Sequence, residues 1–192
     1  MGSMMYLGMY TPTILAGEPV ALNKGGQQWL MQQSQHFIVH FRSELVQYAA
    51  HSLDIAEKVH QDLASQFSQM PTDKTHLTLV DDYDHFNGWA TPLSSAQILL
   101  NLHSPSDINN SEGNDDGLHT LIRHEYTHIV HMELNDRAVT RARDIFDRQI
   151  LFFSHALTPS RLLEGVAIYV ESKNERDYGR LYDSHFAMQM RM

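Results

Sequence analysis

Apolar and polar residues alternate along QWLMQQSQHFIVHF, residues 28–41. Phe37, Val39 and Phe41 fall on one side of this pattern, which has the period of two that a half-buried strand shows. We therefore predict a β-hairpin here, with its turn at residues 33–35.

The next segment changes to a helical period. Ser43 is a residue type that caps helices, and the pattern ends before Met70 and Pro71. Between them, apolar side chains recur three or four positions apart, at Leu45, Ala49, Leu53, Ala56, Val59, Leu63 and Phe67. This spacing predicts one long helix with a single buried face.

More strands and helices are predicted downstream. THLTLVDD, residues 75–82, has the pattern of a strand, and residues 85–105 predict two short strands around Pro92 to Ser95. After a polar loop, helices are predicted at about 117–134, 138–153 and 160–172. Together these elements predict an α+β fold, with a mixed, twisted sheet of about four strands and a long backing helix.

Composition and charge limit the function classes. The 192 residues suffice for one domain, residues 27–192, behind an irregular arm of residues 1–26. The net charge of -9 argues against nucleic acid, and no apolar run approaches a membrane span. The absence of cysteine excludes disulfides and thiolate metal sites. Met1-Gly2-Ser3 resembles a cloning remnant, which leaves open a natural leader before it and further residues after Met192.

The candidate chemistry lies in LIRHEYTHIVHMEL, residues 121–134, where His124 and His128 are four positions apart and Glu125 follows the first. Residues i and i+4 lie on one face of a helix, so both imidazoles can bind one ion at about 2.0–2.1 Å. Glu125 can then accept a proton from a water that the metal acidifies. The alternative is a chance pair, because the chain has 13 histidines.

A third ligand is predicted in PSRLLEGVAIYVES, residues 159–172. Glu164 lies on a predicted helix, and two His with one Glu leave a fourth position for water, as in catalytic zinc sites. The apolar neighbours suggest a largely buried helix, whose carboxylate needs a partner. Gly165 and Ala167 are small, which favours a close approach of the two helices. The alternative is a glutamate in solvent.

Two further residues have two interpretations each. Glu171 is suited to bind the outer nitrogen of a ligand histidine, although a solvated helix glutamate is the more usual case. His131 lies roughly on the face of His124 and is expected to support the site or simply to pack, because three histidines of one helix do not easily converge on one ion.

At this point the sequence resembles a known group of enzymes. HEYTH at 124–128, followed by LEGVAIY at 163–169, is similar to the zinc motifs of gluzincin peptidases, distantly those of the aminopeptidase-N-like group. With NGWATP at 87–92, the chain looks like the bacterial peptidase MA-like domains over about residues 36–185. The resemblance implies a zincin-like fold, a bound Zn²⁺ ion held by His124, His128 and Glu164, and hydrolysis of a peptide or protein substrate. The Gly-Ala-Met-Glu-Asn motif of true aminopeptidases is absent.

The same resemblance assigns further roles. Residues 86–91 would form the sheet edge that pairs with an extended substrate, although a glycine-containing hairpin that merely turns is the alternative. The substrate-binding residues would be Asn87, Gly88, Trp89 and Ala90, and the donors to the tetrahedral oxyanion would be Tyr182 and His185, with Tyr178 as a further option. An extracytoplasmic location and a C-terminal β-propeller in the full-length protein are also implied.

Two other functions are compatible with these motifs. One is a non-catalytic, zinc-containing interaction module of a larger bacterial protein. It is disfavoured because binding does not require Glu125 and because a structural zinc usually has four protein ligands. The other is a metal hydrolase acting on a non-peptide amide, which only substrate screening would separate from a peptidase.

Overall fold

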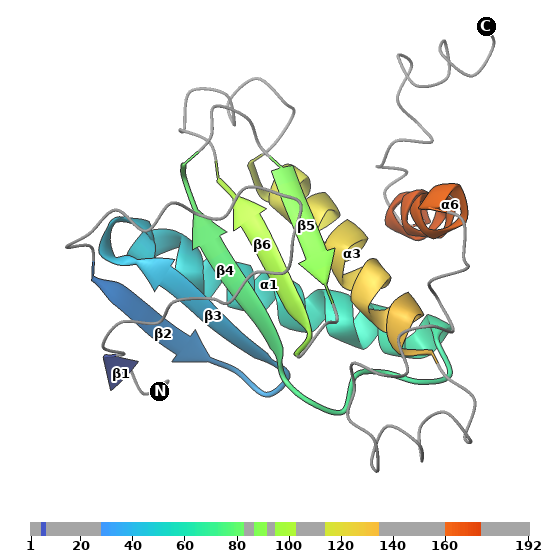
Figure 1. Ribbon diagram of the computed structural model, residues 1–192, viewed down its shortest axis with the longest axis horizontal. Helices are drawn as coiled ribbons and strands as arrows, with labels where there is room; N and C mark the ends of the chain where they lie inside the picture. Colours follow the sequence, from blue (N-terminus) through green and yellow to red (C-terminus); the bar gives the residue numbers. More distant parts are fainter. Residues whose placement is uncertain are drawn as a thin grey trace, which may run out of the picture.

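The computed structural model describes residues 5–6, 28–82, 87–91, 95–102, 114–134 and 160–173. Figure 1 shows a mixed sheet backed by helices, with one more helix beside them. The strands are β1 (Met5–Tyr6), β2 (Trp29–Gln33), β3 (Phe37–Arg42), β4 (Thr75–Val80), β5 (Asn87–Thr91) and β6 (Gln97–Asn101). The helices are the short 3-10 turn η1 (Ser43–Leu45), α1 (Val46–Gln66), α3 (Asn114–Glu133) and α6 (Ser160–Ser172).

The sheet has the strand order β1-β2-β3-β4-β6-β5. β1, β2 and β3 are antiparallel neighbours, while β3, β4 and β6 run parallel. The parallel pair β3 and β4 is joined through α1, because parallel neighbours require a long crossover connection. β5 turns back antiparallel to β6 and ends the sheet on that side. The order places β5 at an edge, which matters for the candidate site.

Most of the predicted elements are confirmed. The hairpin of β2 and β3, the long helix, the strand after it and the pair β5 and β6 occur where the periodicity placed them. The helices that carry the two motifs begin and end within a few residues of the prediction. One detail is wrong: Ser43 opens the 3-10 turn, and the starts of η1 and α1 have no side-chain cap.

The expected number of strands is also wrong. Five strands of at least five residues pair in the sheet, not four, and the two-residue β1 adds a sixth. The difference arises because both the hairpin strands and the pair around Pro92 to Ser95 join one continuous sheet. β1 lies within the arm predicted over residues 1–26, and the rest of that arm lies outside the described residues, as does the helix predicted at 138–153.

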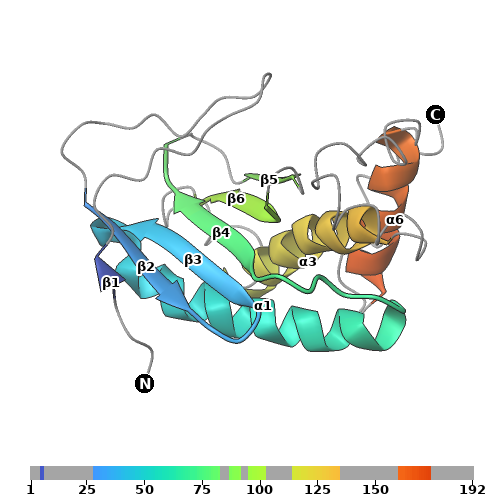
Figure 2. The same ribbon diagram turned by 60° about the horizontal axis from the view of Figure 1, so that its bottom comes forward.

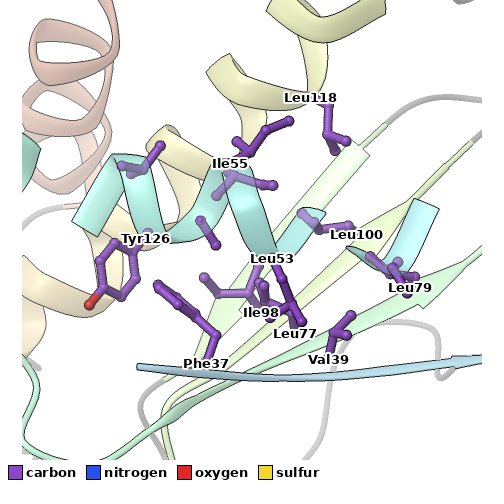
Figure 3. Close-up of a cluster of buried hydrophobic side chains, with 14 of the residues drawn as sticks. Phe37, Val39, Leu53, Ile55, Leu77, Leu79, Ile98, Leu100, Leu118 and Tyr126 are labelled. Atoms are coloured by element: carbon purple, nitrogen blue, oxygen red, sulfur yellow. The ribbon is translucent and has the colours of Figure 1, made fainter. Parts of the chain in front are cut away.

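The core lies between one face of the sheet and the two helices α1 and α3. Alternate residues of the central strands are fully buried there, and Figure 3 shows them directed at Leu53 and Ile55 of α1 and at Leu118 and Tyr126 of α3. The strand residues are Phe37, Val39, Leu77, Leu79, Ile98 and Leu100. Each such side chain contributes about 1.5–3 kcal/mol by leaving water, so this layer fixes the position of α3 under β5 and β6.

The three helices follow one another in space in the order α1, α3, α6. Figure 2 shows α1 and α3 beneath the same face of the sheet and α6 on the far side of α3. α6 packs on α3, and α3 packs on both α1 and β5. Thus α3 is central, and its two sides meet different partners. Among the described helices, none combines the length and the apolar character that crossing a membrane requires.

The other face of the sheet carries a pair of histidines on its parallel strands. The Nε2 atom of His40 lies 2.8 Å from Nδ1 of His76, and the two rings are stacked in parallel planes. Burial lowers the pKa of His40 to about 4, and the charge of His76 adds to this effect. Burial also lowers the pKa of His76, so both rings are neutral near pH 7.

Candidate metal centre

The two motif histidines converge because they are one helical turn apart on α3. His124 and His128 are both buried, and their Nε2 atoms lie 3.1 Å from each other. The rings meet edge to face, with their centroids 4.8 Å apart. The apolar residues Ile122, Ile129 and Val130 of the same helix are fully buried, and this packing fixes the two rings in place.

Glu164 of α6 completes the group. Its Oε2 lies 3.4 Å from Nε2 of His124, and its Oε1 lies 3.5 Å from Nε2 of His128. All three ligand atoms lie within 4.8 Å of one another. The long separation in sequence is bridged by the packing of α6 on α3. The structure therefore brings together all three predicted ligands.

The distances fit a zinc ion. In a tetrahedral site with bonds of about 2.0–2.1 Å, neighbouring donor atoms are about 3.3 Å apart. The two histidine nitrogens here are 3.1 Å apart, and each lies 3.4 or 3.5 Å from a different carboxylate oxygen of Glu164. With one donor atom from each residue, the three atoms lie within 4.8 Å of one another. Two imidazole nitrogens and one carboxylate oxygen are also a donor set that zinc accepts, and three protein donors leave one position open. By geometry and by donor chemistry, these residues could hold the ion.

Glu171 fixes the orientation of the first ligand. Its Oε2 lies 2.6 Å from Nδ1 of His124, and its side chain is completely buried. A hydrogen on Nδ1 is donated to this carboxylate, so the lone pair of His124 is on Nε2, directed at the metal position. Of the two interpretations of Glu171, partner of a ligand and solvated glutamate, the structure supports the first.

Glu125 lies against the edge strand. A Cβ atom built on Gly88 of β5 would be 2.7 Å from Cγ of Glu125 and 2.8 Å from its Oε1. The side chain of Glu125 therefore runs directly across the backbone of Gly88, and it is only 6% exposed. Gly88 is required here for close approach, which is a role that the sequence prediction missed.

Tyr126, in the middle of the motif, faces the opposite way. It is buried in the core beside Phe37, with their ring centroids 4.9 Å apart, and its hydroxyl lies 2.7 Å from Nδ1 of His60. Figure 3 shows the ring among the apolar side chains beneath the sheet. Burial, together with the charges of Glu133 and Glu57, raises the pKa of this phenol above its ordinary value. Tyr126 thus anchors α3 and does not face the metal position.

The environment of Glu164 differs from the expectation. Its side chain is 54% exposed, and Leu162 and Tyr169 of the same helix are each 56% exposed. The prediction of a largely buried helix is therefore wrong, because α6 packs mainly on α3 and its other side is open. Gly165 is also exposed, with nothing within 4 Å of a Cβ built on it, so it does not mediate helix contact, whereas Ala167 is fully buried.

The remaining predicted residues have different outcomes. Asn87, Gly88, Trp89 and Ala90 form β5, the edge strand next to α3. Tyr178, Tyr182 and His185 lie outside the described residues, and their predicted role stays a prediction. His131 is partly buried in the last turn of α3.

Arg123 is a residue whose importance the sequence prediction missed. It is 1% exposed, which is rare for arginine unless it is paired. It directly precedes His124 and shares a helix face with Thr127 and Val130, which are both fully buried. That helical spacing was the available signal that Arg123 lies inside the protein.

Comparisons of the chain with protein-family models, with curated proteins and with solved structures found no significant match. What can be said about function therefore depends on the residues and geometry described above.

Proposed function

We propose that the protein is a zinc-dependent peptidase with a zincin-like fold, as its resemblance to the gluzincins implies. The observation that supports this best is the convergence of His124, His128 and Glu164, whose ligand atoms lie within 4.8 Å of one another. A second carboxylate, that of Glu125, follows His124 directly in α3 and lies against Gly88 without being one of the three grouped residues. A binding site has no need of this extra acid, whereas hydrolysis requires a base.

The roles of the residues follow from this arrangement. Zinc, when bound, supplies a Lewis acid that acidifies a water molecule and polarises the substrate carbonyl. Glu125 accepts the proton of the attacking water and later delivers it to the nitrogen of the leaving amine. The side chain of Glu125 is only 6% exposed because it lies in the narrow space between α3 and β5. Glu171 keeps His124 in the tautomer that presents Nε2 to the metal.

The substrate would lie along β5. This strand ends the sheet, and among the described residues no other strand pairs with its outer edge. An extended peptide can add to such an edge through backbone hydrogen bonds. Gly88 and Ala90 pair with residues of β6 whose side chains point into the core, Leu100 and Ile98, so they share the α3 side of the sheet with Glu125.

Metal analysis combined with one conservative variant tests this function. Purified protein is expected to hold one zinc per chain, and His124→Ala and Glu164→Gln are expected to reduce that content. Glu125→Gln should keep the zinc and lower cleavage of a fluorogenic peptide mixture by at least about a hundredfold, because it removes the base alone. Cleavage by this variant at the wild-type rate would contradict the assignment.

The same experiment separates the competing functions. A zinc-loaded wild type that cleaves no peptide but hydrolyses other amides would indicate the non-peptide hydrolase. A zinc-loaded wild type that hydrolyses nothing would favour the interaction module. The extracytoplasmic location and the β-propeller implied by the resemblance stay predictions.

A further inference from the structure

Arg123 joins three helices at the metal centre. Its Nε donates to the carbonyl oxygen of Val170 at 2.9 Å, and its Nη2 donates to that of Lys173 at 3.3 Å. Its Nη1 forms an ion pair with Asp62 of α1. The guanidinium therefore lies at the C-terminal end of α6 while its backbone belongs to the motif helix.

The chemistry of this contact suits a helix end. The last carbonyls of a helix have no partner within the helix and carry a partial negative charge. The buried guanidinium donates to one of these carbonyls, that of Val170, which also accepts from the amide of Lys173 at 3.3 Å, and to the carbonyl of Lys173 just past the helix. Its positive charge offsets the charge of the helix end. Asp62 neutralises the arginine from the other side, although its own side chain is 49% exposed. The contact is therefore a charged cap on α6 provided by α3.

The position of the cap links it to the ligands. Arg123 and His124 are consecutive in α3, and they contact the consecutive residues Val170 and Glu171 of α6. Glu164 and Glu171 are seven residues apart, about two turns, and therefore lie on one face of α6. From that face Glu171 reaches Nδ1 of His124, and Glu164 reaches its Nε2.

We propose that Arg123 is a positioning residue for the metal centre. By holding the C-terminal turn of α6 against α3, it keeps Glu171 at Nδ1 of His124 and Glu164 near Nε2 of the same ring. This inference rests on the proposed metal site but not on peptidase activity. Among the described elements α6 packs mainly on α3, and its other side is exposed. The cap, together with the core residue Val170, therefore holds the helix in this orientation.

Cobalt binding provides a test that is independent of catalysis. Co²⁺ has a visible absorption band whose intensity falls when a protein ligand is replaced by water and the coordination number rises. Arg123→Gln is expected to weaken Co²⁺ binding at least tenfold and to reduce the band per bound ion, in the same direction as Glu164→Gln. Arg123→Lys, which retains the charge but not the planar fork of donors, should fall between Arg123→Gln and the wild type.

A remote core variant separates positioning from general destabilisation. Leu30→Ala lies in β2, a buried part of the sheet away from β5. It should lower the melting temperature but leave the Co²⁺ affinity and spectrum unchanged. Wild-type affinity and spectrum in Arg123→Gln, or in Arg123→Lys if the glutamine variant does not fold, would overturn the inference. A wild type that binds no Co²⁺, or that binds it equally well after His124→Ala, would overturn the metal site as well.

Discussion

Gly88→Ala is the sharpest perturbation that the site offers. The added Cβ would lie 2.7 Å from Cγ of Glu125, about 0.7 Å short of the 3.4 Å at which ordinary contact begins. Either the strand or the side chain must move. Cγ is not the free end of Glu125, and this residue is only 6% exposed, so the carboxylate is expected to shift by at least a comparable distance.

A shift of this size affects the rate more than the fold. A misplacement of about 1 Å at a reacting group can cost a hundredfold in rate. We therefore expect kcat/KM to fall between about tenfold and a hundredfold, which corresponds to about 1.4–2.7 kcal/mol in transition-state stabilisation. The loss should lie in kcat, because the base moves while the strand edge remains available. The zinc content should not change, because the three atoms nearest to a Cβ at Gly88 all belong to Glu125 and none to a predicted ligand.

The assay is hydrolysis of a peptide that the wild type cleaves, together with metal analysis and thermal unfolding. Gly117→Ala of α3 is the matched control, because nothing lies within 4 Å of a Cβ built there. It should retain activity and gain up to about 1 kcal/mol in stability, since alanine is the better helix former. Full kcat in Gly88→Ala, with Glu125→Gln inactive, would show that β5 does not confine the base. A rise in KM alone would place the effect at the strand edge instead.

Two further predictions concern titratable groups. Glu171→Gln should weaken zinc binding by about 10–100-fold, measured by competition with a chelator, and unchanged affinity would remove Glu171 from the site. The second prediction concerns His40, whose pKa is lowered from 6.5 to about 4 in the folded protein. As the pH falls, the imidazole is therefore protonated in the unfolded chain before it is protonated in the folded protein. The free energy of unfolding should therefore decrease from about pH 6.5 to 4. This decrease should be less steep in His40→Gln, as followed by urea unfolding at a series of pH values; equal slopes would refute the role of His40.

Local patterns explain why the fold and the ligands were largely predictable. The alternation in β3, the helical period in α1 and the i, i+4 pair His124 and His128 are each visible within a few residues of sequence. Glu164 was found because its own helix has a recognisable motif. These features depend on backbone geometry that every strand or helix shares.

Features that depend on how elements meet were harder to foresee. Glu164 and Glu171 share one face of α6, so which of them is the buried acid depends on where along its length that helix meets its neighbours. The apolar pattern alone suggested burial all round. The contact of Gly88 with Glu125 and the cap that Arg123 provides join residues 35 or more positions apart. Such contacts arise only when the helices and the sheet are packed together.

The exposed side of α6 has a consequence for how the protein would respond to removal of the proposed zinc ion. α6 contributes only Val170, with Val166 packed beside it, to the apolar core that α1, α3 and the sheet share. Chelation should therefore loosen this helix before the remainder unfolds. Binding of the ion and docking of α6 onto α3 would then be one reversible step. His124 and His128 would already be in place on α3, and Glu164 would join them as α6 docks.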